Sequence, residues 1–109
     1  MNKEILEILE ELLDFRKRRD WKQFHTPENL SKSIVIEATE LLENYQWGSD
    51  HADINNVKEE VADIFGYLLL LCNDLDIDLL NETKKKIVKN NEKYPVEKAY
   101  GNSKKYTKL

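Results

Sequence analysis

The feature that most constrains the fold is an uncharged, mostly apolar run from Ile64 to Cys72 in an otherwise highly charged chain. Just before it, Val57, Val61 and Ile64 recur at helical spacing, so the run continues a helix. Beyond Ile64 this helix becomes apolar nearly all round, which predicts burial on more than one side. In so small a domain full burial requires a second subunit, so this helix predicts an oligomer.

Three further helices are predicted by the same reasoning. The chain has only 3 glycines and 2 prolines while 35% of its residues are charged, a balance typical of long amphipathic helices. The predicted helices cover about residues 4–19, 27–47, 57–72 and 79–93. Thr26-Pro27 marks the start of the second helix, and Asp78 caps the fourth. Residues 1–109 are thus expected to form one all-α domain, a four-helix bundle with an extended tail from about residue 96.

Charge and cysteine content exclude several classes of protein. A net charge of −4 disfavours wrapping a polyanion such as DNA or RNA. The single cysteine, Cys72, cannot form an internal disulfide, and its apolar surroundings predict a buried thiol in a reducing compartment. The longest apolar run is about nine residues, against roughly 20 for a membrane span, and the N-terminal segment does not resemble a signal peptide. A cytoplasmic protein without a membrane partner is expected.

Four carboxylates on the second and third predicted helices form a candidate metal site. Glu37 and Glu40 are three residues apart, and Glu60 and Asp63 repeat that spacing on the next helix. At about 100° per residue, Glu37 and Glu60 both border the apolar stripe of their helix. Carboxylates beside a core are costly unless compensated, and a hard divalent cation with oxygen ligands compensates them. The spacing therefore predicts a magnesium site.

Alternatives to this site differ in how well they fit. A chain with 21 acidic residues shows acid pairs by chance, so these acids could also be a solvated surface. A di-iron bundle needs Glu-x-x-His pairs, whereas His25 and His51 fall in predicted loops. A calcium loop starting at Asp74 is disfavoured because Leu79 and Lys85 occupy its glycine and glutamate positions.

Together with their flanking segments, these acids resemble the all-α nucleoside triphosphate pyrophosphohydrolases, the MazG-like superfamily, and within it the dCTP pyrophosphatase group. The superfamily pattern is Glu-Glu-x-x-Glu followed by Glu-x-x-Asp on the next helix. Here Ile36 replaces the first acid, a departure that the dCTP group tends to share. The resemblance covers nearly the whole chain and includes Phe15-Arg16-x-x-Arg19-Asp20-Trp21, Gln23-Phe24-His25, Gln46-Trp47 and Lys105-Tyr106-Thr107.

The resemblance implies an enzyme that hydrolyses the bond between the α- and β-phosphates of a nucleoside triphosphate. The products would be the monophosphate and pyrophosphate, and the substrate dCTP or modified dCTP, in cleansing of the nucleotide pool. It also implies Mg²⁺ as cofactor and a homo-oligomer, dimer or tetramer, with sites between subunits. A dUTP-specific relative and a non-enzymatic helical interaction module remain the alternatives.

The resemblance also assigns roles to individual residues. The metal ligands of the family, which would also be catalytic, match Glu37, Glu40, Glu60 and Asp63. Positions around the nucleotide match Trp21, Trp47 and Tyr67 at the base and sugar, His25 beside that pocket, and Lys86 and Asn90 on the last helix. Without the resemblance, the tryptophans would be read as packing anchors and Lys86 as a solvated charge.

Overall fold

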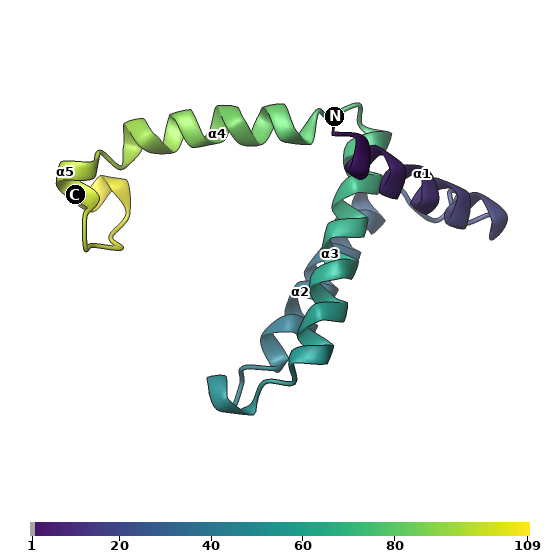
Figure 1. Cartoon of the computed structure of the whole chain (residues 1–109), viewed down its shortest axis with the longest axis horizontal. Helices are drawn as coiled ribbons and strands as arrows, with labels where there is room; N and C mark the ends of the chain where they lie inside the picture. Colours follow the sequence, from purple (N-terminus) through teal and green to yellow (C-terminus); the bar gives the residue numbers. More distant parts are fainter. Residues whose placement is uncertain (1) are drawn as a thin grey trace. The chain divides into compact units, whose positions relative to one another are not determined.

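The computed structural model describes residues 2–109, and these residues form helices joined by turns, with no strand among them (Figure 1). The elements are α1 (Lys3–Arg18), α2 (Pro27–Glu43), η1 (Ser49–His51), α3 (Ile54–Asp74), α4 (Leu79–Lys93), α5 (Val96–Ala99) and η2 (Tyr106–Lys108). The predicted all-α class and its four long helices are confirmed. None of the helices described is both long and apolar enough to cross a membrane.

Two compact units divide the chain, one ending at Ile77 and the other spanning Asp78–Leu109. The first unit contains α1, α2 and α3, and the second contains α4, α5 and η2. A single domain that unites all four helices in one bundle stays a prediction.

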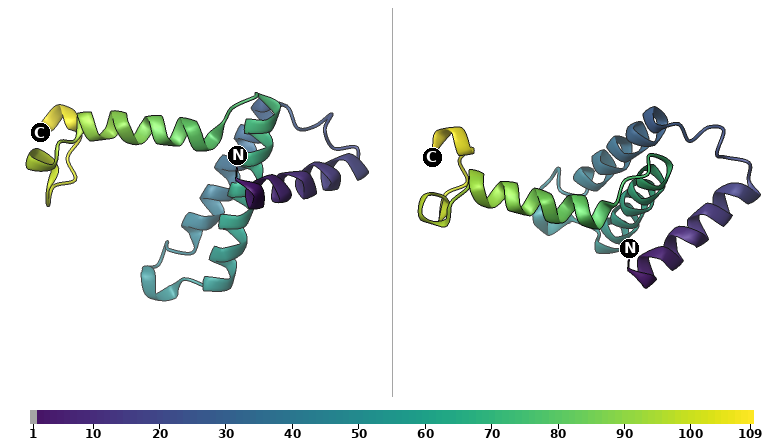
Figure 2. Two further views of the ribbon diagram at one scale, coloured as in Figure 1. Left: turned by 45° about the horizontal axis from the view of Figure 1, so that its top comes forward. Right: turned by 90° about the horizontal axis from the view of Figure 1, so that it is seen from above.

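The core of the first unit lies where α2 and α3 pack side by side as an antiparallel hairpin (Figures 1 and 2). Leu30 of α2 and Leu69 of α3 are the most fully buried side chains among the residues described. Helix α1 also packs on α3, with the Leu12 side chain over Gly66. Cys72 is buried, as predicted. Helix α3 therefore contributes to both packing interfaces of this unit.

The helix starts follow the capping signals of the sequence. The Thr26 hydroxyl oxygen accepts a hydrogen bond from the Asn29 N–H at 3.1 Å, and Pro27 occupies the first helical position. The Asp78 carboxylate accepts from the Asn81 N–H at 3.1 Å at the start of α4. Both predicted starts are confirmed.

Two segments differ from the expectation. Helix α2 ends at Glu43 rather than near residue 47, because the Asn44 side-chain amide donates to the Leu41 carbonyl at 3.3 Å and to the Asn56 side chain at 2.8 Å. These bonds turn the chain toward α3 before the apolar pattern ends. The tail, expected to be extended, contains the helical turn α5, which follows Pro95 with its φ of −56°.

Aromatic contacts order the second unit. The Tyr94 ring, at the end of α4, meets the Tyr106 ring edge-on with centroids 6.1 Å apart. The Lys93 Nζ lies 5.0 Å from the centroid of the Tyr106 ring. The last residues of the chain are thereby held against the end of α4.

Replacing Leu69 with alanine should lower the free energy of unfolding by about 2–5 kcal/mol, because a side chain only 1% exposed leaves a cavity in the hairpin core. Leu75→Ala is the matched control, since Leu75 ends the same helix and is 47% exposed, so its loss should cost at most about 1 kcal/mol. Urea denaturation followed by circular dichroism measures both variants. Equal losses for the two variants would contradict the assigned core.

Candidate metal centre and the cavities beside it

A cluster of three carboxylates lies where α2 packs on α3. One carboxylate oxygen each from Glu37, Glu60 and Asp63 lie within 4.8 Å of one another. Glu60 is only 7% exposed, and its Oε2 is buried with no hydrogen-bond partner among the residues described. The antiparallel hairpin thus brings together acids that are far apart in the sequence, and three of the four predicted ligands meet.

The fourth predicted ligand, Glu40, lies one helical turn beyond Glu37. Its side chain is exposed, and its oxygens are outside the close cluster. It is near enough to Glu37 to affect that carboxyl group by its charge and by a side-chain hydrogen bond. Glu40 therefore borders the cluster, and its role as a ligand stays a prediction.

The cluster strongly disfavours ionisation of Glu37. A side-chain hydrogen bond with Glu60, burial, and the charges of Glu40 and Asp63 raise the pKa of Glu37 from its ordinary 4.5 to about 8. The cause is the one known for paired carboxylates, which retain a proton when no other positive charge is near. Either a proton or a cation must compensate this cluster.

The donor set fits a hard divalent cation. All three clustered groups offer carboxylate oxygens, which are the ligands that Mg²⁺ and Ca²⁺ prefer. The unpartnered Oε2 of Glu60 supplies a buried acceptor that a cation would satisfy. The residues present therefore fit the predicted metal, and Glu37, Glu60 and Asp63 would hold it.

An aromatic cavity of about 240 Å³ opens beside Asp63. Four rings form its wall in sequence, with centroid separations of 5.7 Å from Phe15 to Trp21, 6.3 Å from Trp21 to His25 and 6.4 Å from His25 to Tyr67. Flat aromatic faces suit a ligand with a planar ring, and a cation at the neighbouring carboxylates would allow that ligand to carry an anionic group.

His25 brings a polar atom to this aromatic wall. Its Nδ1 is buried with no hydrogen-bond partner within the part of the chain that the structure describes. Burial and the positive charge of Arg16 lower the pKa of His25, and the Asp74 charge opposes them in part. A neutral imidazole offers one donor and one acceptor to a ligand.

A second, more polar cavity of about 410 Å³ is lined by Glu40 and Glu60 together with Trp47. Since Asp63 lines the aromatic cavity, the carboxylates connect the two cavities. Trp21 and Trp47, both predicted around the base, therefore line different cavities of this chain.

Lys86 and Asn90 lie on α4, in the second unit, where both side chains are exposed. They are four residues apart and share a helical face, as predicted. Their approach to a nucleotide stays a prediction.

Sequence reasoning missed one pair of residues near the aromatic cavity. Arg16, which lines the cavity, is buried and forms an ion pair with Asp74. The two residues are 58 positions apart, so no local spacing connects them. Arg16 lies within the motif Phe15–Trp21, which was the only available signal.

Comparisons with known proteins were consistent with one another. A sequence model of the MazG-like family matches residues 32–109. The chain is 35% identical over 105 residues to dCTP pyrophosphatase 1 of Rattus norvegicus and 34% identical to that of Homo sapiens, covering 88% of this chain and 62% of each relative. The chain thus spans less than two thirds of these curated relatives. A crystal structure of a pyrophosphatase from Archaeoglobus fulgidus is similar, with a TM-score of 0.80 and 41% identity over 87% of this chain and 95% of that chain.

In protein stripped of divalent cations, the free energy of unfolding should fall as the pH rises from 4.5 to about 8, because unfolding releases the Glu37 proton in that window. The folded state has the higher pKa and binds more protons there, so stability decreases with pH. Glu37→Gln cannot ionise, and its stability should depend less on pH. Urea titrations in chelator at stepped pH measure the difference, with Glu43→Gln as an exposed control on the same helix. The same pH dependence in wild type and Glu37→Gln would contradict this.

Proposed function

This chain belongs to the MazG-like family, and we propose on that premise that it hydrolyses a nucleoside triphosphate to the monophosphate and pyrophosphate. Relatives named dCTP pyrophosphatase 1 and a similar structure of a pyrophosphatase support this chemistry. The observation that carries the proposal is the cluster of Glu37, Glu60 and Asp63, with an aromatic cavity beside it. A cation site next to a cavity for a planar ring is the arrangement that a metal-bound nucleotide requires.

We propose Mg²⁺ as the cofactor, held by Glu37, Glu60 and Asp63, with Glu40 as a further ligand. When bound, the metal would neutralise triphosphate charge and lower the pKa of a bound water. Glu37, Glu60 and Asp63 would hold the metal, and a carboxylate of this cluster would accept the proton of the attacking water. The close spacing and the buried Oε2 of Glu60 support this assignment.

The aromatic cavity is the proposed site for the base and sugar. Trp21, His25 and Tyr67 line its wall, and Asp63 joins the cavity to the carboxylates. We propose dCTP or modified dCTP as the substrate, in cleansing of the nucleotide pool, because the curated relatives are named for dCTP. Trp47 lines the polar cavity and not the aromatic one. We therefore propose that Trp47 contacts a nucleotide bound mainly by a second subunit, in a site shared between the two. Lys86 and Asn90 on α4 are proposed to approach the phosphate and the nucleotide, as their match to the family's last helix implies.

A homo-oligomer, dimer or tetramer, is part of the proposal. Val35 and Leu42 of α2 and Val61 of α3 are all more than half exposed in the single chain. Val35 and Ile36 also line a groove on α2 whose surface is almost wholly apolar. Exposed apolar surface on the central hairpin supports burial by a second copy. The buried single thiol of Cys72 supports the proposed cytoplasmic location.

Incubation with Mg²⁺ and each of the common deoxynucleoside triphosphates should release a monophosphate and pyrophosphate, fastest from dCTP or a 5-modified dCTP. Fastest release from dUTP would favour the dUTP-specific alternative. Diphosphate with phosphate would point to other chemistry, and no Mg²⁺-dependent turnover would favour a helical interaction module. Chromatographic resolution of the products decides among these outcomes.

Within the same assay, Glu60→Gln should lower turnover by at least about a hundredfold, because it removes a charged metal ligand. Its circular dichroism should match that of the wild type, since the substitution preserves size. Glu59→Gln is the matched control, being the neighbouring exposed acid on α3. Near-normal turnover of the Glu60 variant would overturn the assignment of the metal site.

Light scattering should give a solution mass that is a multiple of the chain mass of 12.9 kDa. Val61→Asp should shift the mass toward one chain, because a charge on the exposed apolar face of the hairpin opposes its burial. Lys58→Asp is the control on the same helix, at a residue already polar and exposed. A wild-type mass of one chain at high micromolar concentration would contradict the proposed oligomer.

A further inference from the structure

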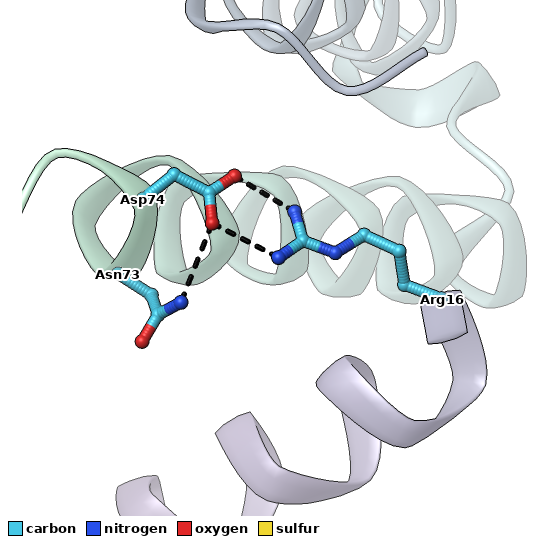
Figure 3. A network of polar contacts seen from close by, with 3 residues as sticks. All are labelled: Arg16, Asn73 and Asp74. Carbon is cyan, nitrogen blue, oxygen red and sulfur yellow. Dashed lines mark hydrogen bonds and ion pairs between the residues drawn. The ribbon is translucent and has the colours of Figure 1, made fainter. Parts of the chain in front are cut away.

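A buried bidentate ion pair between Arg16 and Asp74 joins the last turn of α1 to the end of α3. The Arg16 Nη1 lies 2.7 Å from Asp74 Oδ2, and its Nη2 donates to Asp74 Oδ1 at 2.9 Å (Figure 3). Arg16 is 4% exposed and Asp74 12%, and the Asn73 side-chain amide donates to Asp74 at 3.3 Å. Because the guanidinium is planar, the two bonds together fix both the distance and the relative orientation of the Arg16 and Asp74 side chains.

Stability alone does not account for this pair. Desolvating two charges offsets most of their attraction, and well-packed apolar side chains at such positions are often as stabilising. The exposed pair between Arg18 and Asp14 on α1 shows the contrast, since at 3.0 Å in solvent it contributes little and leaves the helix unconnected to α3. What the buried pair adds is a fixed geometry between α1 and α3.

The main chain of Arg16 fixes the cavity wall at the same time. Its carbonyl oxygen accepts from the Trp21 N–H at 3.1 Å, and the Trp21 carbonyl accepts from the His25 N–H at 3.2 Å. The Trp21 ring meets His25, which meets Tyr67 on α3. Tyr67 and Asp74 are two turns apart on α3. The contacts therefore run from Asp74 through Arg16, Trp21 and His25 to Tyr67, and both ends of this series lie on α3.

We propose that Arg16 and Asp74 are a positioning pair that fixes the Trp21–His25 wall of the aromatic cavity and thereby sets the affinity for the nucleotide. The role in affinity rests on the proposed function, whereas the role in fixing the wall does not. Asp74 is 11 residues beyond Asp63 on one helix, about 16 Å along its axis, so the pair acts on binding and leaves the carboxylate chemistry unchanged.

Three variants test the pair in the full-length chain: Asp74→Asn, Arg16→Met, and the double variant Arg16→Met/Asp74→Met. For each, the KM for the nucleotide should rise about tenfold while kcat stays within about twofold of wild type, because ground-state and transition-state binding weaken together. The double variant should regain the wild-type melting temperature, since it leaves no unpaired buried charge, and yet keep the raised KM. Arg18→Met is the control and should leave both constants unchanged.

A readout independent of turnover is the accessibility of Trp21. In a Trp47→Phe background Trp21 is the only tryptophan, and acrylamide should quench its fluorescence more strongly in Asp74→Asn than in the parent. Stronger quenching in a protein without pyrophosphohydrolase activity would support the pair's role in the wall and overturn only the proposed function. Unchanged quenching and unchanged KM in the double variant would overturn the positioning role.

Discussion

The structure around the site depends on the burial of the Glu60 carboxylate where α2 contacts α3. An ionised carboxylate there needs a compensating charge or proton. Without a cation, the hydrogen bond with Glu60 raises the pKa of Glu37 to about 8, so that Glu37 retains its proton at neutral pH. The hairpin that buries Leu30 and Leu69 therefore also holds acids that oppose its own stability. Such a conflict between fold and local chemistry is typical of functional sites.

The cluster also divides the surface of the first unit chemically. On the side of Asp63 the cavity wall is aromatic, and on the side of Glu40 and Glu60 the lining is mostly polar. A nucleotide has the same division, with a planar base at one end and charged phosphates at the other. One elongated ligand can therefore match both regions only if its phosphates lie at the carboxylates, where a cation can reverse the local charge.

Local signals in the sequence were sufficient for the four long helices and for the spacing of the acid pairs. Spacing of three residues placed Glu37 and Glu40 on one helix face, and the Asp78 cap located the start of α4. Where a feature depends on distant residues, local signals fail. The bond from Asn44 to Asn56 ended α2 early, and it becomes visible only once the hairpin has formed. The separation of Trp21 and Trp47 into two cavities has the same origin, because it depends on how α1 and the connection between α2 and α3 pack.

Two kinds of buried charge in this unit lead to opposite conclusions. Arg16 meets both oxygens of Asp74, so each charge has its partner and the pair has little left to offer a ligand. Glu60 is buried to a similar degree, yet one of its oxygens has no partner among the residues described. A buried charge that is paired within the chain fixes geometry. A buried acceptor without a partner is unfavourable in the free chain, so a cation or donor that binds it gains that interaction. On this reasoning the ion pair belongs to the framework of the cavity, and the carboxylates are the part that binds.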